Sequence, residues 1–274
     1  MGFPPFTHAI KWLVIVNAAI YLLWLILERA MQTTAAYVAY VFWLRPEAVI
    51  HGALWQLVTY SFFHYGSLFQ ILFNMLALWM FGATLESEWG SRRFVELYLF
   101  GAIGAALAAV ALAYIGGGST FFQFLGINPE TSITSASGAV YAVMVAFAVL
   151  HGDQEFMMFP LPFMIRAKYL VAIAVFISLA ATFQGFGSSV AQLGGAFFGW
   201  VYVRFVPRRG LGLAERYFEW RNSYYRWKRR RAGRKFEVYM RKHDRDQYFD
   251  EYGNYRGPEN GEKGNGEHRG PWLQ

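Results

Sequence analysis

The chain has 274 residues, of which 55% are hydrophobic, 19% are aromatic and only 16% are charged. Soluble domains carry about 25% charged residues, so this composition argues against a protein that is soluble as a whole. Cysteine is absent, which excludes disulfides and thiol chemistry. The formal net charge of +7 comes mostly from Lys and Arg that follow residue 204, outside the apolar runs. The sequence therefore predicts a membrane-embedded part followed by a basic tail.

Six apolar runs approach the ~20 residues that a bilayer core requires, although the fourth is short. We expect spanning helices at about residues 12–27, 68–85, 94–115, 139–150, 169–183 and 189–206. The first run could instead be a signal peptide, but no small-residue cleavage pattern follows it and further apolar runs come later. The expected fold is therefore an all-α membrane protein, with a six-helix membrane domain over residues 1–206.

The segment 30–66, between the first two runs, is rich in Tyr, Trp and Phe and is interrupted by Pro46 and Gly52. No clean window within it is apolar over the length of a bilayer. Amphipathic aromatic rings suit the membrane interface, so we expect this segment to lie on one leaflet or to dip into it.

The placement of Lys and Arg predicts the orientation. One side of the expected spans carries Lys11, Arg92, Arg93, Arg166, Lys168, Arg208 and Arg209, whereas the other side carries only Arg29 and Arg45. Positive charge stays on the cytoplasmic side, so both termini are expected there, in a bacterial inner membrane. The Ser137 end of the fourth span then lies toward the outer leaflet.

Beyond residue 206 the composition changes. Residues 207–251 are expected to form a basic, aromatic juxtamembrane helix, and residues 252–274 a disordered tail. Within the first part, residues 215–240 alternate Lys or Arg with aromatic residues. A solvated basic helix is one interpretation. Binding to anionic lipid headgroups fits better, since each basic residue near such a surface contributes ~1 kcal/mol. Nucleic-acid binding is not expected beside a membrane.

Polar side chains inside membrane spans are costly and often mark function. Asn74, Ser137 and Gln192 lie in or at the ends of three different apolar runs, and each run also carries small residues, namely Gly82, Gly138, Gly195 and Gly199. Small residues let helices approach until such polar groups meet. The alternatives are ordinary interhelical hydrogen bonds, and for Ser137 a helix N-cap. The histidines show no metal-ligand spacing and no cofactor motif is present, so neither a metal nor a cofactor is expected.

Several motifs occur in the same order as in the rhomboid family of intramembrane serine proteases, which residues 8–206 resemble. These motifs are Trp55-Gln56 and Phe62-Phe63-His64, Gln70-x-x-x-Asn74, Gly82 with Glu86 and Gly90, Ser135-Ala136-Ser137-Gly138 with Tyr141, and Ala191-Gln192 with Gly195 and Gly199. The resemblance implies a six-helix rhomboid-like bundle in which segment 30–66 is the family's L1 segment.

The resemblance also implies roles for individual residues. Ser137 matches the nucleophile and Gln192 the position of the base. Gln70, Asn74 and Ser137 match the groups that stabilise the oxyanion. Supporting roles fall to Tyr141, Gly138, Gly195, Glu86 and His64.

Departures from the family pattern bear on activity. Gln192 stands where the family has the histidine that takes the serine proton, and a carboxamide cannot carry that proton near neutral pH. Losing a member of such a dyad costs up to ~10⁶ in kcat in a soluble serine protease. Gln70 replaces a second histidine but can still donate a hydrogen bond. Gln56 replaces an arginine, and Ser135 replaces a glycine whose backbone freedom the turn requires.

Another histidine could in principle act as the base. His151 lies fourteen residues beyond Ser137 on the same expected helix, which is ~21 Å at about 1.5 Å per residue and out of reach. His64 matches a bracing position of the L1 segment and is the native candidate at a suitable depth.

Three functions follow from these observations. The leading hypothesis is a rhomboid-like pseudoprotease that binds transmembrane segments of client proteins without cleaving them. The alternative is an active rhomboid serine endopeptidase that uses Ser137 with an unconventional or weakened dyad. A third hypothesis is a scaffold whose residues 207–274 recruit a cytoplasmic partner or lipid.

Overall fold

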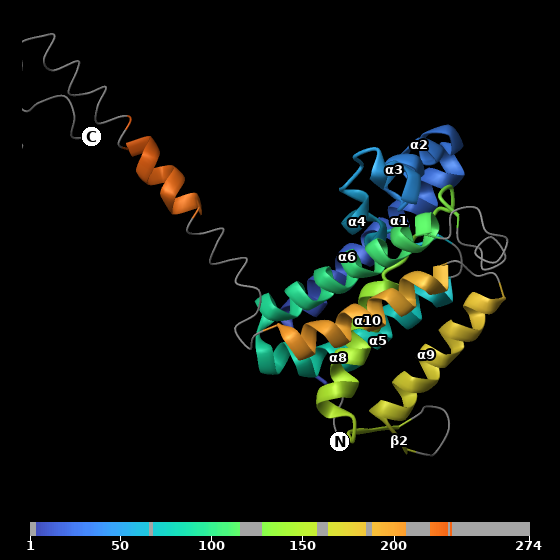
Figure 1. Ribbon diagram of the computed structural model, residues 1–274, viewed down its shortest axis with the longest axis vertical. Coiled ribbons are helices and arrows are strands. Elements are labelled where there is room, and N and C mark those ends of the chain that lie inside the picture. The colour runs from blue at the N-terminus through green and yellow to red at the C-terminus, as the bar shows by residue number, and fades with distance from the viewer. Residues whose placement is uncertain are drawn as a thin grey trace, which may run out of the picture. The chain divides into compact units, whose positions relative to one another are not determined.

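The computed structural model describes residues 4–65, 68–115, 128–157, 164–184, 188–206, 220–229 and 231. The chain divides into two units, Met1–Leu211 and Gly212–Gln274. The helices of the first unit are α1 (His8–Ala30), α2 (Gln32–Phe42), α3 (Pro46–Ile50), α4 (Gln56–Thr59), the 3-10 helix η1 (Tyr60–Phe62), α5 (Leu68–Trp89), α6 (Ser91–Ile115), α8 (Ser137–His151), α9 (Ala167–Phe183) and α10 (Ser188–Phe205) (Figure 1). In the second unit, residues 220–229 are helical.

Each of the six expected apolar runs falls on a helix, namely α1, α5, α6, α8, α9 and α10. Among the described residues, α1, α5 and α6 are long and apolar enough to cross a membrane, while α8 and α9 are apolar but shorter. The expected predominantly helical fold is therefore confirmed, with α1, α5 and α6 as candidate membrane spans. The count of six spans stays a prediction, and the expected disordered tail at 252–274 lies outside the described residues.

The L1 segment is built from short helices, because Pro46 begins α3 and Gly52, with φ +104°, follows its end. An isolated antiparallel bridge joins Leu44 to Ile133, so the L1 segment is attached to the strand-like stretch that leads into α8. How this segment lies against a bilayer stays a prediction.

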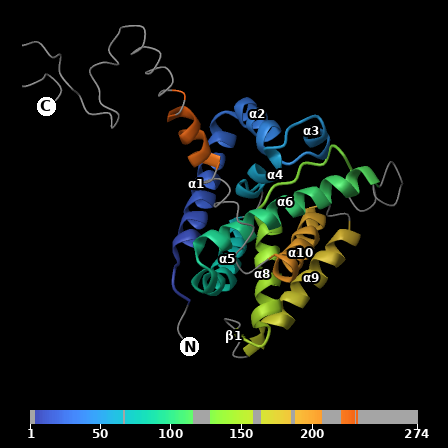
Figure 2. The same cartoon turned by 60° about the vertical axis from the view of Figure 1, so that its left-hand side comes forward.

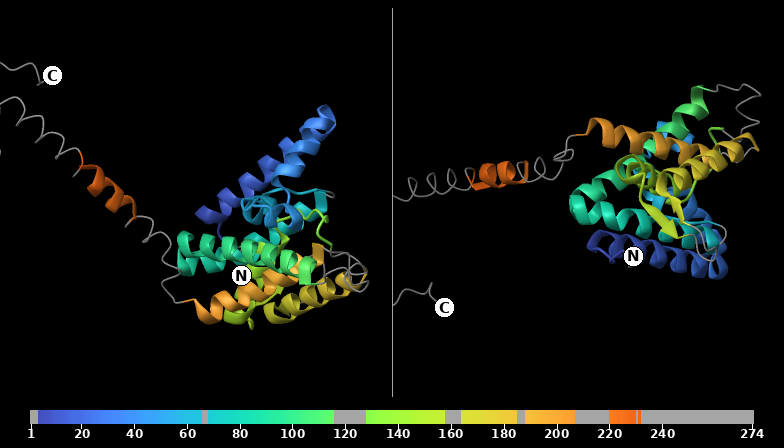
Figure 3. Two further views of the ribbon diagram at one scale, coloured as in Figure 1. Left: turned by 45° about the horizontal axis from the view of Figure 1, so that its top comes forward. Right: turned by 90° about the horizontal axis from the view of Figure 1, so that it is seen from below.

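A short hairpin between α8 and α9 was not expected from the sequence. Strand β1 (Glu155–Met157) pairs antiparallel with β2 (Met164–Arg166), with Phe156 opposite Ile165 (Figure 3). Phe156 packs its ring against Phe81 of α5 and Phe147 of α8, which holds the hairpin to the bundle.

Helix α8 lies at the centre of the first unit, where it packs against α10, α6, α5 and α9 (Figures 1 and 2). Most of its side chains are buried, whereas α9 exposes large apolar residues such as Phe176 and Ile177. An exposed apolar face of this kind is what lipid contact allows in a membrane protein. Ser137 is the first residue of this central helix.

The close packing of α8 on α10 depends on glycine. A Cβ added to Gly195 would overlap the carbonyl oxygen of Gly138, and one added to Gly199 would overlap that of Ala142. Because the contacts advance in the same direction along both helices, α8 and α10 run parallel. This backbone contact requires small residues, as the sequence analysis expected for Gly138 and Gly195.

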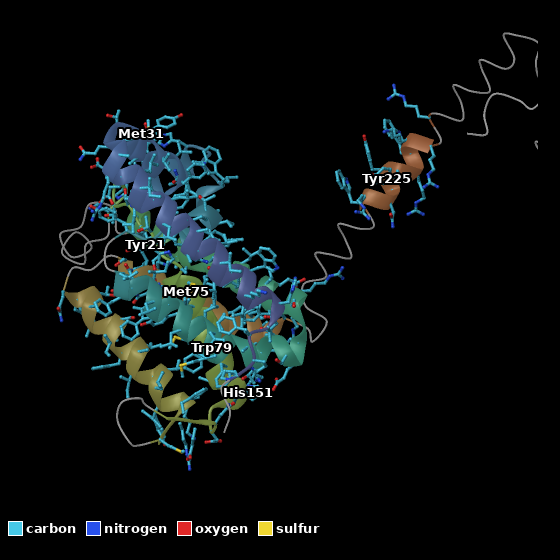
Figure 4. All side chains as sticks on the ribbon, turned by 180° about the vertical axis from the view of Figure 1, so that it is seen from behind. Tyr21, Met31, Met75, Trp79, His151 and Tyr225 are labelled. Carbon is cyan, nitrogen blue, oxygen red and sulfur yellow. The ribbon has the colours of Figure 1, made fainter. Side chains whose placement is uncertain are left out.

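Two polar contacts show which helix ends lie together. His151 at the end of α8 lies 2.9 Å from the carboxylate of Glu88 near the end of α5. Tyr202 near the end of α10 lies 3.4 Å from the backbone oxygen of Arg93 at the start of α6. In Figure 4, His151 and Met31, which follows α1, lie at opposite ends of the bundle. Ser137 begins α8 and therefore lies at the end opposite to His151.

Candidate functional site

Ser137 is buried, with 6% of its surface exposed. Its backbone N–H does not point into open space but donates to the side-chain oxygen of Ser135, at 3.0 Å. The neighbouring N–H of Ala136 donates to Nε2 of His64, at 3.4 Å. The backbone N–H groups of Ala136 and Ser137 are therefore both engaged by side chains of the protein itself.

Ser135 has φ +146°, a backbone conformation that residues other than glycine rarely adopt. Its N–H donates to the carbonyl of Tyr60 at 3.2 Å, so the L1 segment holds this residue in place. Its hydroxyl oxygen also accepts from Nδ2 of Asn74 at 3.0 Å. Position 135 was expected to favour glycine, and its backbone does have the geometry that glycine tolerates best.

His64 is buried between the L1 segment and the start of α8. Its Nε2 faces two donors, the N–H of Ala136 at 3.4 Å and Nδ2 of Asn74 at 3.5 Å. This nitrogen must therefore be the unprotonated one. Burial lowers the pKa of His64 to about 4, and a hydrogen bond with the backbone of Phe62 offsets this in part. The imidazole is thus neutral at pH 7, with its lone pair directed at Ala136.

Gln192 is half-buried on α10, and its side chain bonds to a residue of α9 and not to Ser137. Its Oε1 lies 2.5 Å from Oγ of Ser178, which in turn lies 2.7 Å from the hydroxyl of Tyr141. An amide oxygen only accepts, so Ser178 donates to Gln192, while the hydroxyl of Tyr141 donates to the backbone carbonyl of Ala174 at 3.2 Å. Within the described part of the chain, no hydrogen bond joins Gln192 or His64 to Ser137.

Asn74 and Gln70 lie one turn apart on α5. Asn74 reaches the turn before α8 through its bond to Ser135. Gln70 is half-buried, and among the described residues it forms no hydrogen bond with Ser135 or Ser137. The structure therefore brings Asn74 to the turn before Ser137, while the oxyanion roles of Asn74 and Gln70 stay predictions.

Glu86 has a structural position. Its carboxylate accepts from the backbone N–H of Ala9 at 2.7 Å and of Ile10 at 3.0 Å, and it also receives the hydroxyls of Thr7 and Ser91. A negative charge at a helix N-terminus satisfies donors that have no partner inside the helix. Glu86 therefore attaches α1 to α5 and to the start of α6.

The glycines on either side of Glu86 serve the same junction. A Cβ at Gly82 would lie 2.8 Å from the ring of Phe94. Gly90 has φ +79° in the turn between α5 and α6, which a glycine adopts without strain.

Gln56 replaces the arginine expected in the L1 segment and is almost fully buried. Its Oε1 accepts from the backbone N–H of Arg45 at 3.0 Å, and its Nε2 donates to the carbonyls of Tyr40 and Val41 at 3.1 Å. The neighbouring Trp55 also donates to Val41, at 2.8 Å. The carboxamide of Gln56 therefore joins the end of α2 to the start of α4 within the L1 segment.

A cavity of about 750 Å³ lies away from Ser137. Its walls come from α1, from the L1 segment and from residues 130 and 132 of the stretch before α8, and they include Trp24, Glu28, Tyr40, Trp43, Arg45 and Tyr65. Ser137, Asn74 and Gln192 are not among its lining residues.

Residues 11–222 match the protein family described as "Eukaryotic integral membrane protein (DUF1751)". This match covers more than half of the chain. The chain belongs to this family. It is an integral membrane protein, and the expected bacterial inner membrane finds no support because the family description points to eukaryotes.

Rhomboid proteins are among the relatives of this family member. It is 26% identical to Rhomboid-like protein 19 of Arabidopsis thaliana over 163 residues, which cover 57% of this chain and 49% of that protein. It is also 26% identical to the mitochondrial Rhomboid protein 1 of Saccharomyces cerevisiae over 220 residues, 75% of this chain and 57% of the relative. The Rhomboid protease GlpG of Salmonella paratyphi A is 26% identical over 161 residues, 59% and 49% of the two chains. The chain thus spans about half the length of the curated relatives it matches, and the resemblance inferred from the motifs is confirmed.

Ser178 is the site residue that sequence reasoning missed. It is a buried serine within the apolar run that forms α9. The rule that polar residues inside spans mark function applies to it as well as to Asn74, so it could have been singled out. Its link to Gln192 could not, because nothing in the sequence specifies how α9 is rotated toward α10.

Proposed function

We propose that this family member is a rhomboid-like pseudoprotease, which binds transmembrane segments of client proteins without cleaving them. The observation that carries the proposal is the side chain of Gln192. It stands where the resemblance requires a base, and its hydrogen bond goes to Ser178 at 2.5 Å.

The chemistry of the neighbouring groups supports the same conclusion. A serine hydroxyl without an adjacent base remains a weak nucleophile. An amide side chain cannot accept its proton near neutral pH. His64, the remaining native candidate, is a weak base because burial lowers its pKa to about 4, and its free nitrogen is directed at Ala136.

The proposed membrane topology has six spans with both termini on the cytoplasmic side. Its support is that basic residues gather at the bundle end that holds His151. The ion pair of Lys168 with Asp153, at 2.6 Å, joins the start of α9 to the residues after α8 and so to this end. The basic residues of this end are Lys11, Arg92, Arg93, Arg166, Lys168 and Arg204. Such a concentration is typical of the cytoplasmic side.

We also propose that residues 215–240 bind anionic lipid headgroups. Support comes from the helix at 220–229, in which all side chains are exposed. The rings of Trp220, Tyr224 and Trp227 follow one another along it. The guanidinium carbon of Arg231 lies 5.3 Å from the ring centroid of Trp227, within the range of a cation–π contact. Aromatic rings beside basic groups suit the headgroup region.

The experiment that tests the pseudoprotease proposal is a cleavage assay in proteoliposomes. The full chain is reconstituted with labelled single-span substrates, and the Ser137→Ala variant is the control. We expect no cleavage that depends on Ser137. Serine-dependent cleavage by the natural chain would overturn the proposal and favour the active protease.

Client binding is tested separately with a photoreactive amino acid at position 137 in the same proteoliposomes. The labelled single-span segments should be captured by the crosslinker, and an excess of unlabelled segment should compete. Recovery of lipid alone would contradict client binding.

A further inference from the structure

Two of the donors expected to stabilise an oxyanion converge on one atom of the protein itself. The backbone N–H of Ser137 and Nδ2 of Asn74 each donate to Oγ of Ser135, and both distances are 3.0 Å. One donor comes from α8 and the other from α5, and Asn74 lies 61 residues before the acceptor Ser135. A hydroxyl oxygen has two acceptor lone pairs, so both are used.

We infer that the Ser135 hydroxyl occupies the place where the carbonyl oxygen of a bound peptide would accept these hydrogen bonds, so that the chain closes its own oxyanion site. The inference rests on the rhomboid-like site described under the proposed function and deepens it. Lack of a base and a closed oxyanion site are separate obstacles to catalysis. A substrate carbonyl would have to displace Ser135 before either donor became free.

The backbone around Ser135 fixes the hydroxyl in this position. Its φ of +146° and its N–H bond to Tyr60 set the direction of the side chain. The adjacent donor, the N–H of Ala136, is taken by His64. The start of α8 would otherwise present these N–H groups to an anion, because a helix N-terminus leaves its first donors without partners. Side chains of the protein thus fill a position that an incoming oxyanion would use.

A glycine at position 135 would leave the site open, and this provides a matched pair of variants. Ser135→Gly removes the hydroxyl and the strained Cβ together. Ser135→Ala removes the hydroxyl and keeps the Cβ. Comparing the two separates the effect of the hydroxyl from that of crowding by the side chain.

The probe is a fluorescent peptidyl boronic acid, added to the full chain in detergent micelles. Its boron forms a bond with the Ser137 oxygen, the Ser137 proton passes to solvent, and one oxygen of the tetrahedral boronate takes the oxyanion position. We expect both Ser135 variants to bind the probe about tenfold more tightly than the natural chain, since a competing pair of hydrogen bonds is gone. Adding Ser137→Ala should remove the gain.

The inference is overturned by equal affinity of the natural chain and both variants, or by no binding in any of them. A gain with Ser135→Gly but not with Ser135→Ala also overturns it, because the Cβ would then be the obstacle. If the Ser135→Ala variant does not fold, the test uses the NMR chemical shift of the Ser137 amide proton in the Ser135→Gly variant. This resonance should move upfield because the proton has lost its acceptor, and an unchanged chemical shift contradicts the inference.

A second experiment separates this inference from the pseudoprotease proposal. In a Gln70→His, Gln192→His background, we expect cleavage of a single-span substrate to rise at least tenfold on adding Ser135→Gly. The closed oxyanion site is contradicted if the background variant cleaves equally well with and without Ser135→Gly. It is also contradicted if neither of these two variants cleaves the substrate. Cleavage by the natural chain would instead refute the pseudoprotease proposal. The affinities of the boronic acid for the natural chain and the two Ser135 variants would then still test the role of Ser135.

Discussion

The bond between Ser178 and Gln192 makes a quantitative prediction about the base position. If Gln192 serves as a structural link between α9 and α10, changing either partner should destabilise the protein, and the two effects should not add. The perturbations are Ser178→Ala, Gln192→Leu and the double variant. Ser178 is 2% exposed and its Oγ lies 2.5 Å from the glutamine oxygen, so no water replaces the lost partner.

The magnitude follows from the membrane setting. Interhelical hydrogen bonds in membrane proteins contribute on average about 0.6 kcal/mol and at most about 1.7 kcal/mol. The pair here is buried, short and linked to Tyr141 at 2.7 Å, so we expect a coupling near the upper part of that range, about 1 kcal/mol. Independent sites add to within roughly 0.3–0.5 kcal/mol, so a coupling of this size is measurable.

The assay is reversible unfolding of the purified protein by SDS in mixed micelles, which gives the free energy of unfolding for each of the four chains. A matched control cycle pairs Ser178→Ala with Ser87→Ala, because the hydroxyl of Ser87 donates to the backbone of Ala83 in its own helix α5 and, among the described residues, to no other group. The control cycle should be additive. An additive result for Ser178 and Gln192 as well would refute the structural link and leave Gln192 free to turn toward Ser137.

Three further predictions concern the packing and the charges that hold the site. Gly195→Ala places a Cβ on the carbonyl oxygen of Gly138, so α8 and α10 must separate. We expect the free energy of unfolding to fall by about 1–3 kcal/mol in the same assay, and an unchanged stability would contradict the close contact. Glu86→Gln removes a charge that accepts from the backbone of α1, so the thermal midpoint should fall with a loss of about 1.5–3 kcal/mol, whereas an unaltered midpoint would argue that α1 is held by apolar packing alone. The pKa of His64 falls from 6.5 to about 4 on folding, so between these pH values the unfolded chain binds one proton more than the folded chain. The free energy of unfolding should therefore decrease by up to about 3 kcal/mol as the pH is lowered through this window. The His64→Gln variant should lack this pH dependence.

Local composition was sufficient to predict the helical membrane part. The first helix was expected at about 12–27 and runs His8–Ala30, and the third was expected at about 94–115 and runs Ser91–Ile115. Hydropathy over ~20 residues is a property of the segment itself, so packing does not alter it. The β1–β2 hairpin was missed because its strands have three residues each, too few for a periodic pattern to be recognised.

The motifs predicted which glycines and polar residues matter but not what each contacts. Glycine spacing on α10 identified a close helix contact, and Gly195 does lie against Gly138. The sequence also suggested that glycine suits position 135 better than serine, and φ +146° agrees. It did not indicate that Gln56, in place of an arginine, would satisfy the backbone of Tyr40 and Val41.

The sequence by itself determined that this protein is a helical membrane protein of rhomboid-like pattern with a carboxamide at the base position, because residue identity and spacing carry that information directly. Only the tertiary structure decided that this carboxamide pairs with Ser178 and that the hydroxyl of Ser135 takes the donors of Asn74 and Ser137. A hydrogen bond extends about 3 Å, so its partner is set by the relative rotation and approach of helices distant in the chain, which no local pattern encodes.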